Sequence, residues 1–207
     1  RSTLFPYTTL FRSARFTSYV DRVFEKDAPS VAGAVARGRL STIARLVAAN
    51  QAGELIKARI GRQAEVSPST VTSYLEALED VYLLGRLRAW TPNLTTREVA
   101  RPKVYITDSA LALGLGGVRP QELEPLISVA IGGYIEGFVA AELRKQQTWS
   151  ETEFSLFHYR DRSGAEVDIV VELPDRRVIG IEVKSSSTPK GKHFKGLRAL
   201  QERLGER

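Results

Sequence analysis

The sequence predicts a mixed α/β (α+β) fold in two parts. Before residue 83, and again between residues 126 and 147, apolar residues recur at three- and four-residue intervals, which is typical of helices that bury one face. Between residues 154 and 186, short apolar runs are separated by turn signals, which is typical of strands. Prolines and glycines after residue 113 mark a linker, so we expect one domain over residues 14–117 and a second over 118–207.

The composition allows a buried core and excludes several kinds of site. Hydrophobic residues make up 43% of the 207 residues and charged residues 26%. The absence of Cys excludes disulfides, a thiol nucleophile and thiolate metal ligands, and two His argue against a histidine-based metal site. No apolar run approaches the roughly 20 residues of a membrane span. We therefore expect a cytoplasmic protein without a membrane partner.

The first thirteen residues, RSTLFPYTTLFRS, read as the translation of a common sequencing-library adapter. We expect residues 1–13 to be an artefact, with the protein-derived chain starting near Ala14 as a fragment that lacks its natural N-terminus. Without Arg1 and Arg12, the chain has 28 basic and 24 acidic residues. This mildly basic balance permits a nucleic-acid partner without requiring one.

Residues 16–51 have a helical pattern, and two shorter helices follow in GELIKARIG and SPSTVTSYLEALED. Ser67 before Pro68 is a helix-start signal, because a hydroxyl caps the first turn and proline fits the position after it. Val71, Leu75 and Leu78 then form one apolar stripe. Two short helices joined by a turn predict a helix-turn-helix.

Two strands, LGRLRAW and RPKVYITD, are expected after this motif, on either side of the polar loop TPNLTTREVA. A helix-turn-helix followed by a β-hairpin is a winged helix, a common DNA-binding arrangement. The candidate DNA contacts are hydroxyls at the start of the second helix and cations around the hairpin, since phosphate contacts supply most non-specific affinity. They are Ser69, Thr70, Thr72, Ser73, Arg86, Arg88, Arg97, Arg101 and Lys103. The alternative is an ordinary solvated charge cluster on a winged helix that contacts proteins.

The second part starts with the helix LISVAIGGYIEGFVAAELRKQQ, whose expected buried stripe includes Ile135, Phe138 and Leu143. Strands are expected in FSLFHYR, EVDIVVEL and VIGIEVKSS, followed by a helix that aligns Leu197, Leu200 and Leu204. With regular alternation, the acidic side of the second strand carries Glu166, Asp168 and Val170, and the apolar side carries Val167, Ile169 and Val171. Glu182 and Lys184 share one side of the third strand.

Antiparallel pairing of these strands would bring Asp168 and Glu182 together, with Lys184 about 7 Å further along. Two carboxylates at that separation suit a hard divalent cation such as Mg²⁺, and Glu136 on the preceding helix is a third candidate ligand. The metal would polarise a phosphodiester and acidify a bound water, with Lys184 orienting that water. The catalytic candidates are therefore Lys184, Glu182 and Asp168, and the metal candidates are Asp168, Glu182 and Glu136. The alternative for the E-x-K triplet alone is a solvated strand face.

A helical Glu, then GAEVD and E-V-K, resembles the PD-(D/E)XK nuclease core, with Glu136, Asp168 and the triplet Glu182–Lys184 at the matching positions. The ordered motifs SPSTVTSYLEALEDVYLL, RPKVYITDSALAL, GGYIEGFVAAEL, YRDRSGAEVDIVVE and GIEVKSSS resemble the domain of unknown function that follows the ATPase domain in a group of AAA-type (archaeal-ATPase-like) proteins. The resemblance covers residue 16 to the end. It implies a winged helix followed by a restriction-endonuclease-like domain that is truncated at its C-terminus.

The resemblance also implies a P-loop ATPase domain ahead of this fragment, which would bind ATP and allow self-association as a homo-oligomer. No G-x-x-x-x-G-K-[ST] motif is present here, so the fragment itself has no ATP site. The leading hypothesis is the DNA-binding, Mg²⁺-dependent, nuclease-like C-terminal part of such an ATPase. The main alternative is a non-catalytic DNA- or protein-binding regulatory module, and a third is a transcriptional regulator with a sensor domain.

Overall fold

The computed structural model describes residues 22, 34–118, 129–185, 188 and 190–205. The expected adapter, most of the helical pattern before residue 34, and Pro120 and Pro125 of the expected linker lie outside these residues. The helices are α2 (Ala34–Ala49), α3 (Lys57–Gln63), α4 (Pro68–Asp80), α5 (Leu94–Val99), α6 (Ser109–Leu115), α7 (Val129–Gln146), the 3₁₀ helix η2 (Gly191–Phe194) and α8 (Lys195–Leu204). The strands are β1 (Gly53–Glu54), β2 (Leu84–Ala89), β3 (Lys103–Ile106), β4 (Ser155–Arg160), β5 (Glu166–Glu172) and β6 (Val178–Ile181). This is the mixed α/β class expected from the sequence.

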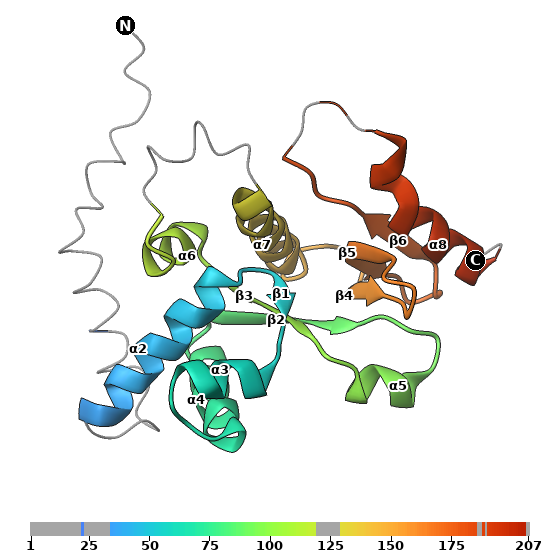
Figure 1. Ribbon diagram of the computed structural model, residues 1–207. Helices are drawn as coiled ribbons and strands as arrows, with labels where there is room; N and C mark the ends of the chain where they lie inside the picture. The colour runs from blue at the N-terminus through green and yellow to red at the C-terminus, as the bar shows by residue number, and fades with distance from the viewer. Residues whose placement is uncertain (1–21, 23–33, 119–128, 186–187, 189, 206–207) are drawn as a thin grey trace, which may run out of the picture.

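One six-stranded mixed sheet, ordered β1-β3-β2-β4-β5-β6, runs through both expected parts of the chain (Figure 1). β2 and β3 form the expected antiparallel pair, and β4, β5 and β6 pair antiparallel in sequence order. The two groups are joined by parallel pairing of Arg88 with Phe157 and Ala89 with His158. The boundary expected at residue 118 therefore lies between strands that share one sheet.

The helices α3 and α4 form as expected, and α4 begins where the capping signal places it. The Ser67 hydroxyl accepts a hydrogen bond from the Thr70 backbone N–H at 3.1 Å, and Pro68 is the first helical residue. Val71, Leu75 and Leu78 are fully buried against α2, α6 and the sheet. The segment between β2 and β3, expected as a loop, contains α5, because the Asn93 side chain caps it by accepting from the Thr96 N–H.

Besides the core around α4, the protein has two hydrophobic cores, which lie on opposite faces of the sheet. α7 packs on one face, against Leu156, Ile169 and Val171, and α8 packs on the other, against Phe157 and Val170. The expected stripe of α7 is wrong in part. Phe138 is 48% exposed, while Ala140 and Ala141 are buried, because small side chains allow the helix to lie close to the sheet.

A β-bulge changes which residues of β5 share a face. Phe157 pairs with Val170, but Tyr159 pairs with Val167, so β5 has one extra residue between these positions. Val167 consequently lies in the α8 core, whereas Ile169 and Val171 lie in the α7 core. The regular alternation expected from the sequence is therefore wrong at Asp168, which lies within the bulge.

We predict that Gly196→Ala destabilises the protein, because a Cβ at this position would lie 1.7 Å from the backbone oxygen of Glu166, which cannot move cheaply. The expected loss of unfolding free energy is about 1–3 kcal/mol, measured by urea denaturation. Gly132→Ala in α7 is the matched control, because its Cβ would meet no atom within 4 Å. It should be neutral or stabilise the helix by up to about 1 kcal/mol. Equal behaviour of the two variants would contradict the close docking of α8 on β5.

Candidate functional site: a buried cluster of paired charges

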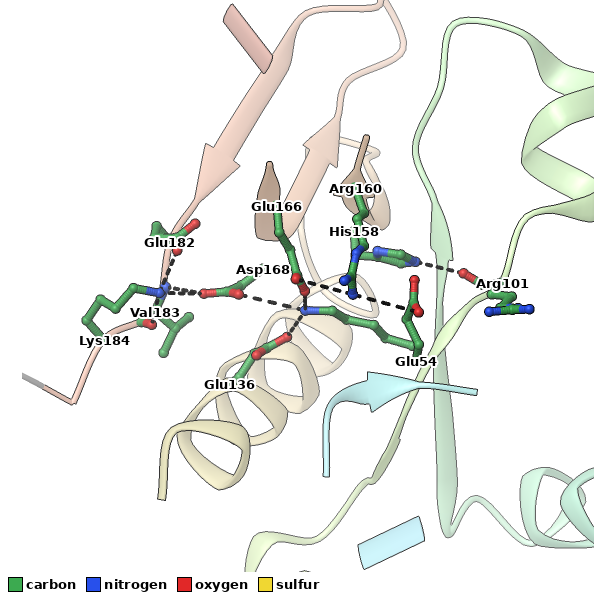
Figure 2. A network of polar contacts seen from close by, with 11 residues as sticks. Glu54, Arg101, Glu136, His158, Arg160, Glu166, Asp168, Glu182, Val183 and Lys184 are labelled. Atoms are coloured by element: carbon green, nitrogen blue, oxygen red, sulfur yellow. Dashed lines mark hydrogen bonds and ion pairs between the residues drawn. The ribbon is translucent and has the colours of Figure 1, made fainter. Parts of the chain in front are cut away.

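Lys103 pairs with three carboxylates of one polar cluster, and its side chain is only 3% exposed. Figure 2 shows these carboxylates, Glu136, Glu166 and Asp168, close to one another. β3 supplies this lysine, and its Nζ is 2.6 Å from Glu136 of α7, 2.6 Å from Glu166 of β5 and 3.7 Å from Asp168 of β5. A buried ammonium is tolerated only when carboxylates compensate its lost hydration. The cluster therefore ties the β2–β3 hairpin to both α7 and β5.

The predicted trio of Asp168, Glu182 and Lys184 is brought together beside this lysine. Lys184 Nζ lies 2.5 Å from Glu182 Oε1 and 3.4 Å from Asp168 Oδ2. The β5–β6 register pairs Ile169 with Ile181, so Glu182 follows directly opposite Asp168. The sequence predicted Glu182 and Lys184 within the third strand. In the structure β6 ends at Ile181, so both residues lie beyond it. Asp168 Oδ2 also accepts a hydrogen bond from the Val183 N–H at 2.9 Å.

Arg160 and His158, which the sequence did not assign to the site, lie beside it. Arg160 Nη1 lies 3.7 Å from both Glu54 and Glu166. His158 is 1% exposed, and its Nε2 lies 3.0 Å from the Arg101 carbonyl oxygen. The sequence predicts His158 to lie either at the surface or behind the ligands rather than to be a ligand, and its burial excludes the surface position.

Burial and charge set the protonation of the cluster. Burial raises the pKa of Glu136 to about 7, although the nearby Lys103 ammonium opposes the shift. Burial also raises the pKa of Glu182 against the opposing Lys184 hydrogen bond. For Glu166, the hydrogen bond and charge of Lys103 outweigh burial and lower the pKa. Burial tends to lower the pKa of Lys103, but its carboxylate partners raise it overall, so the ammonium stays charged.

The arrangement does not fit a divalent metal ion as it stands. Across the part of the chain that the structure describes, no three acidic or histidine side chains are placed so that they could hold a metal ion. Asp168 directs one oxygen toward Lys103 and the other toward Lys184, so both face ammonium groups. A metal between Asp168 and Glu182 would lie against Lys184, at a strong electrostatic cost. One oxygen differs: Glu182 Oε2 is buried and has no hydrogen-bond partner.

The hydroxyls proposed to contact DNA lie at the start of α4, where the sequence placed them. Ser69 and Ser73 are exposed, and Thr70 and Thr72 are half-buried. Most already make local contacts: Ser67 Oγ lies 2.7 Å from Ser69 Oγ and 2.8 Å from Thr70 Oγ1. Thr72 Oγ1 donates to the Pro68 carbonyl.

Most of the cations proposed around the hairpin are already paired with carboxylates. Arg86 pairs with Glu79 at 2.5 Å, Arg88 with Glu98 at 2.8 Å, and Arg97 with Glu172 at 2.6 Å. Lys103 is surrounded by acids and cannot reach a phosphate in this arrangement, so we remove it from the proposed DNA contacts. Arg101 is exposed.

Fold and site together define a two-part α/β protein. The two parts share one sheet and a cluster of acids that are paired with lysines of the same chain. Residues 7–122 match the family described as "Domain of unknown function (DUF8612)", and the chain belongs to this family. That match begins within the segment read as adapter. Residues 131–207 match a second family, "Domain of unknown function (DUF4143)", which is found in C-terminal regions associated with AAA-type ATPases.

Two uncharacterized mycobacterial proteins are similar to the chain, Rv2008c of Mycobacterium tuberculosis and Mb2031c of Mycobacterium bovis. Each is 31% identical over 135 residues, which is 64% of this chain and 29% of the relative. The match thus spans less than a third of each relative. No solved structure matches the chain. Among the residues described here, no helix has the length and apolar character needed to cross a membrane.

We predict that Lys103→Met costs far more stability than Lys145→Met. Both lysines pair with a carboxylate at 2.6 Å, but Lys103 is 3% exposed and Lys145 is 57% exposed. Removing Lys103 leaves buried carboxylates without a counter-ion, at about 3–5 kcal/mol, whereas an exposed pair contributes under about 1 kcal/mol. Urea denaturation of both variants measures the difference. Similar losses would show that the cluster is solvated.

We also predict a pH dependence from Glu136, whose pKa of about 7 lies above the ordinary 4.5. A raised folded-state pKa stabilises the protein below the unfolded pKa, and this contribution is lost as the pH rises through the folded value. The stability of the parent relative to Glu136→Gln should therefore fall between pH 4.5 and 7 and level off above 7. Urea midpoints of both proteins across this range test the sign. A difference that rises with pH would contradict the assignment.

Proposed function

We propose that the chain is a DNA-binding, non-catalytic C-terminal module of an AAA-type ATPase. In this proposal the first part is a winged helix, and the second part has the layout of a PD-(D/E)XK nuclease without its metal chemistry. The association with ATPases is supported by the family matched by residues 131–207. The ATPase domain, with its ATP site and any self-association, would lie in the longer protein.

The order of elements supports DNA binding. The helices α3 and α4 are joined by a short turn, α4 begins with exposed hydroxyl residues, and the β2–β3 hairpin follows. In helix-turn-helix proteins, the N-terminal residues of the second helix contact the major groove. The hairpin contributes little phosphate affinity here, because its arginines are largely paired with acids.

The pairing of Lys103 is the observation that supports a non-catalytic role. Its Nζ lies 2.6 Å from Glu136 and from Glu166. A nuclease-like site needs such acids to be free to bind a metal ion, but here they pair with an ammonium group of the protein. Lys184 neutralises Asp168 and Glu182 in the same way. The acids thereby stabilise the junction of the two parts.

Mg²⁺-dependent phosphodiester cleavage is the second candidate, because Glu182 Oε2 is buried without a partner and Glu182 lies opposite Asp168. Asp168 and Glu182 would hold the ion with help from Glu136. This candidate requires Lys184 to leave its present contacts, since its ammonium joins both carboxylates.

We predict that millimolar Mg²⁺ neither stabilises the chain nor supports cleavage of plasmid or linear duplex DNA. Thermal unfolding, measured in EDTA and in Mg²⁺ at matched ionic strength, is the direct readout. A ligand at one hundred times its dissociation constant stabilises a protein by about 2.7 kcal/mol, so a site with a dissociation constant of about 10 μM would be visible at about 1 mM Mg²⁺.

Stabilisation by Mg²⁺ that is lost in Asp168→Asn would contradict the proposal and favour the second candidate. Asp175→Asn is the matched control, because Asp175 is an exposed acid that pairs with the exposed Arg177, away from the cluster. Cleavage that is abolished by Asp168→Asn but kept by Asp175→Asn would establish the nuclease assignment.

A further inference from the structure

The segment after the acid cluster contains cations and no acids. From Val183 to Gln201 there is no Asp or Glu, and the stretch includes Lys184, Lys190, Lys192, Lys195 and Arg198. The last four are exposed. We call Lys190, Lys192, Lys195 and Arg198 the basic face.

Three residues of the basic face recur at intervals of three across η2 and the start of α8. Lys192 lies in η2, and Lys195 and Arg198 lie in α8. Residues three apart lie on the same side of such helical turns. The opposite side of α8 is buried, because Gly196 and Leu200 pack on the sheet. The cations therefore lie on the outer side of this helix. Figure 1 shows α8 beside β5 and β6.

These cations differ from most of those around the hairpin, where Arg101 alone of the five proposed DNA contacts has no carboxylate partner among the described residues. Among the described residues, no ion pair joins the basic face to a carboxylate, and Glu202, the nearest acid along α8, makes none with Arg198. Arg86, Arg88, Arg97 and Lys103 all have carboxylate partners. An already neutralised cation gains little from a phosphate, whereas a free one displaces condensed counter-ions from DNA.

We propose that the basic face is a second DNA-contacting surface, which binds the phosphate backbone of duplex DNA without reading its sequence. The proposal rests on the proposed DNA-binding function and adds a surface apart from α4, which Figure 1 shows away from α8. A membrane surface fits less well. A helix that lies in a membrane interface needs an exposed apolar face, and that face of α8 is occupied by the sheet.

The test compares two triple variants of the whole chain that remove the same charge. Lys192→Ala/Lys195→Ala/Arg198→Ala removes the basic face, and Arg39→Ala/Arg45→Ala/Arg162→Ala removes three exposed arginines elsewhere. Binding to a fluorescent random-sequence duplex is measured by anisotropy over a range of salt concentrations. Urea midpoints confirm that both variants fold.

We expect the first variant to lose about tenfold or more in affinity at low salt, because each phosphate contact contributes a slope of about 0.9 in the logarithmic salt plot. That slope should fall by about two to three, and the control should change affinity less than about twofold. Equal losses in both variants would mean that only total charge matters and would overturn the inference alone. Absence of duplex binding by the parent chain would overturn the proposed function as well. Binding to phosphatidylserine vesicles in its place, lost in the first variant, would assign the face to membranes.

Discussion

The buried ammonium of Lys103 is the interaction on which the arrangement of the site depends. The Lys103 side chain extends from the hairpin strand β3 to carboxylates of α7 and β5, which are distant in the sequence. Burying one charge is costly, and burying the three acids together without it would be costlier. The position of the hairpin relative to α7 and β5 is therefore fixed by electrostatics as well as by the parallel pairing of β2 with β4. The two parts that the sequence predicts as separate domains share one sheet and one buried polar cluster.

Local physics made much of the fold predictable. The cap at Ser67, the stripe of α4 and the strand character of β4 and β5 depend on residues close in sequence, and the structure confirms them. The buried face of α7 was not predictable from hydrophobicity, because Gly133 and Gly137 lie against Gln51 and a larger side chain would not fit. Gln51 itself binds both backbone groups of Ile106 through its amide, a contact that joins residues 55 positions apart.

The group of Asp168, Glu182 and Lys184 was predictable from the sequence, whereas the place of Lys103 was not. Asp168, Glu182 and Lys184 were grouped from strand spacing, and they do lie together. The bulge in β5 and the early end of β6 could not be foreseen from alternation, since both depend on pairing with neighbouring strands. Lys103 was assigned to the DNA contacts because it is one of several cations around the hairpin. Only the tertiary structure reveals the three acids around it.

The distribution of paired and unpaired cations now separates two roles for positive charge. Arg86, Arg97 and Lys103 neutralise acids of the same chain, so they stabilise the fold and contribute little field outside it. Cations on η2 and α8 have no such partners among the described residues, so their field extends into solvent, where a polyanion can respond to it. Net charge alone would not distinguish these groups, since each side chain counts equally in the sequence. A DNA-binding role for this chain therefore depends less on how basic it is than on which cations its own acids leave free.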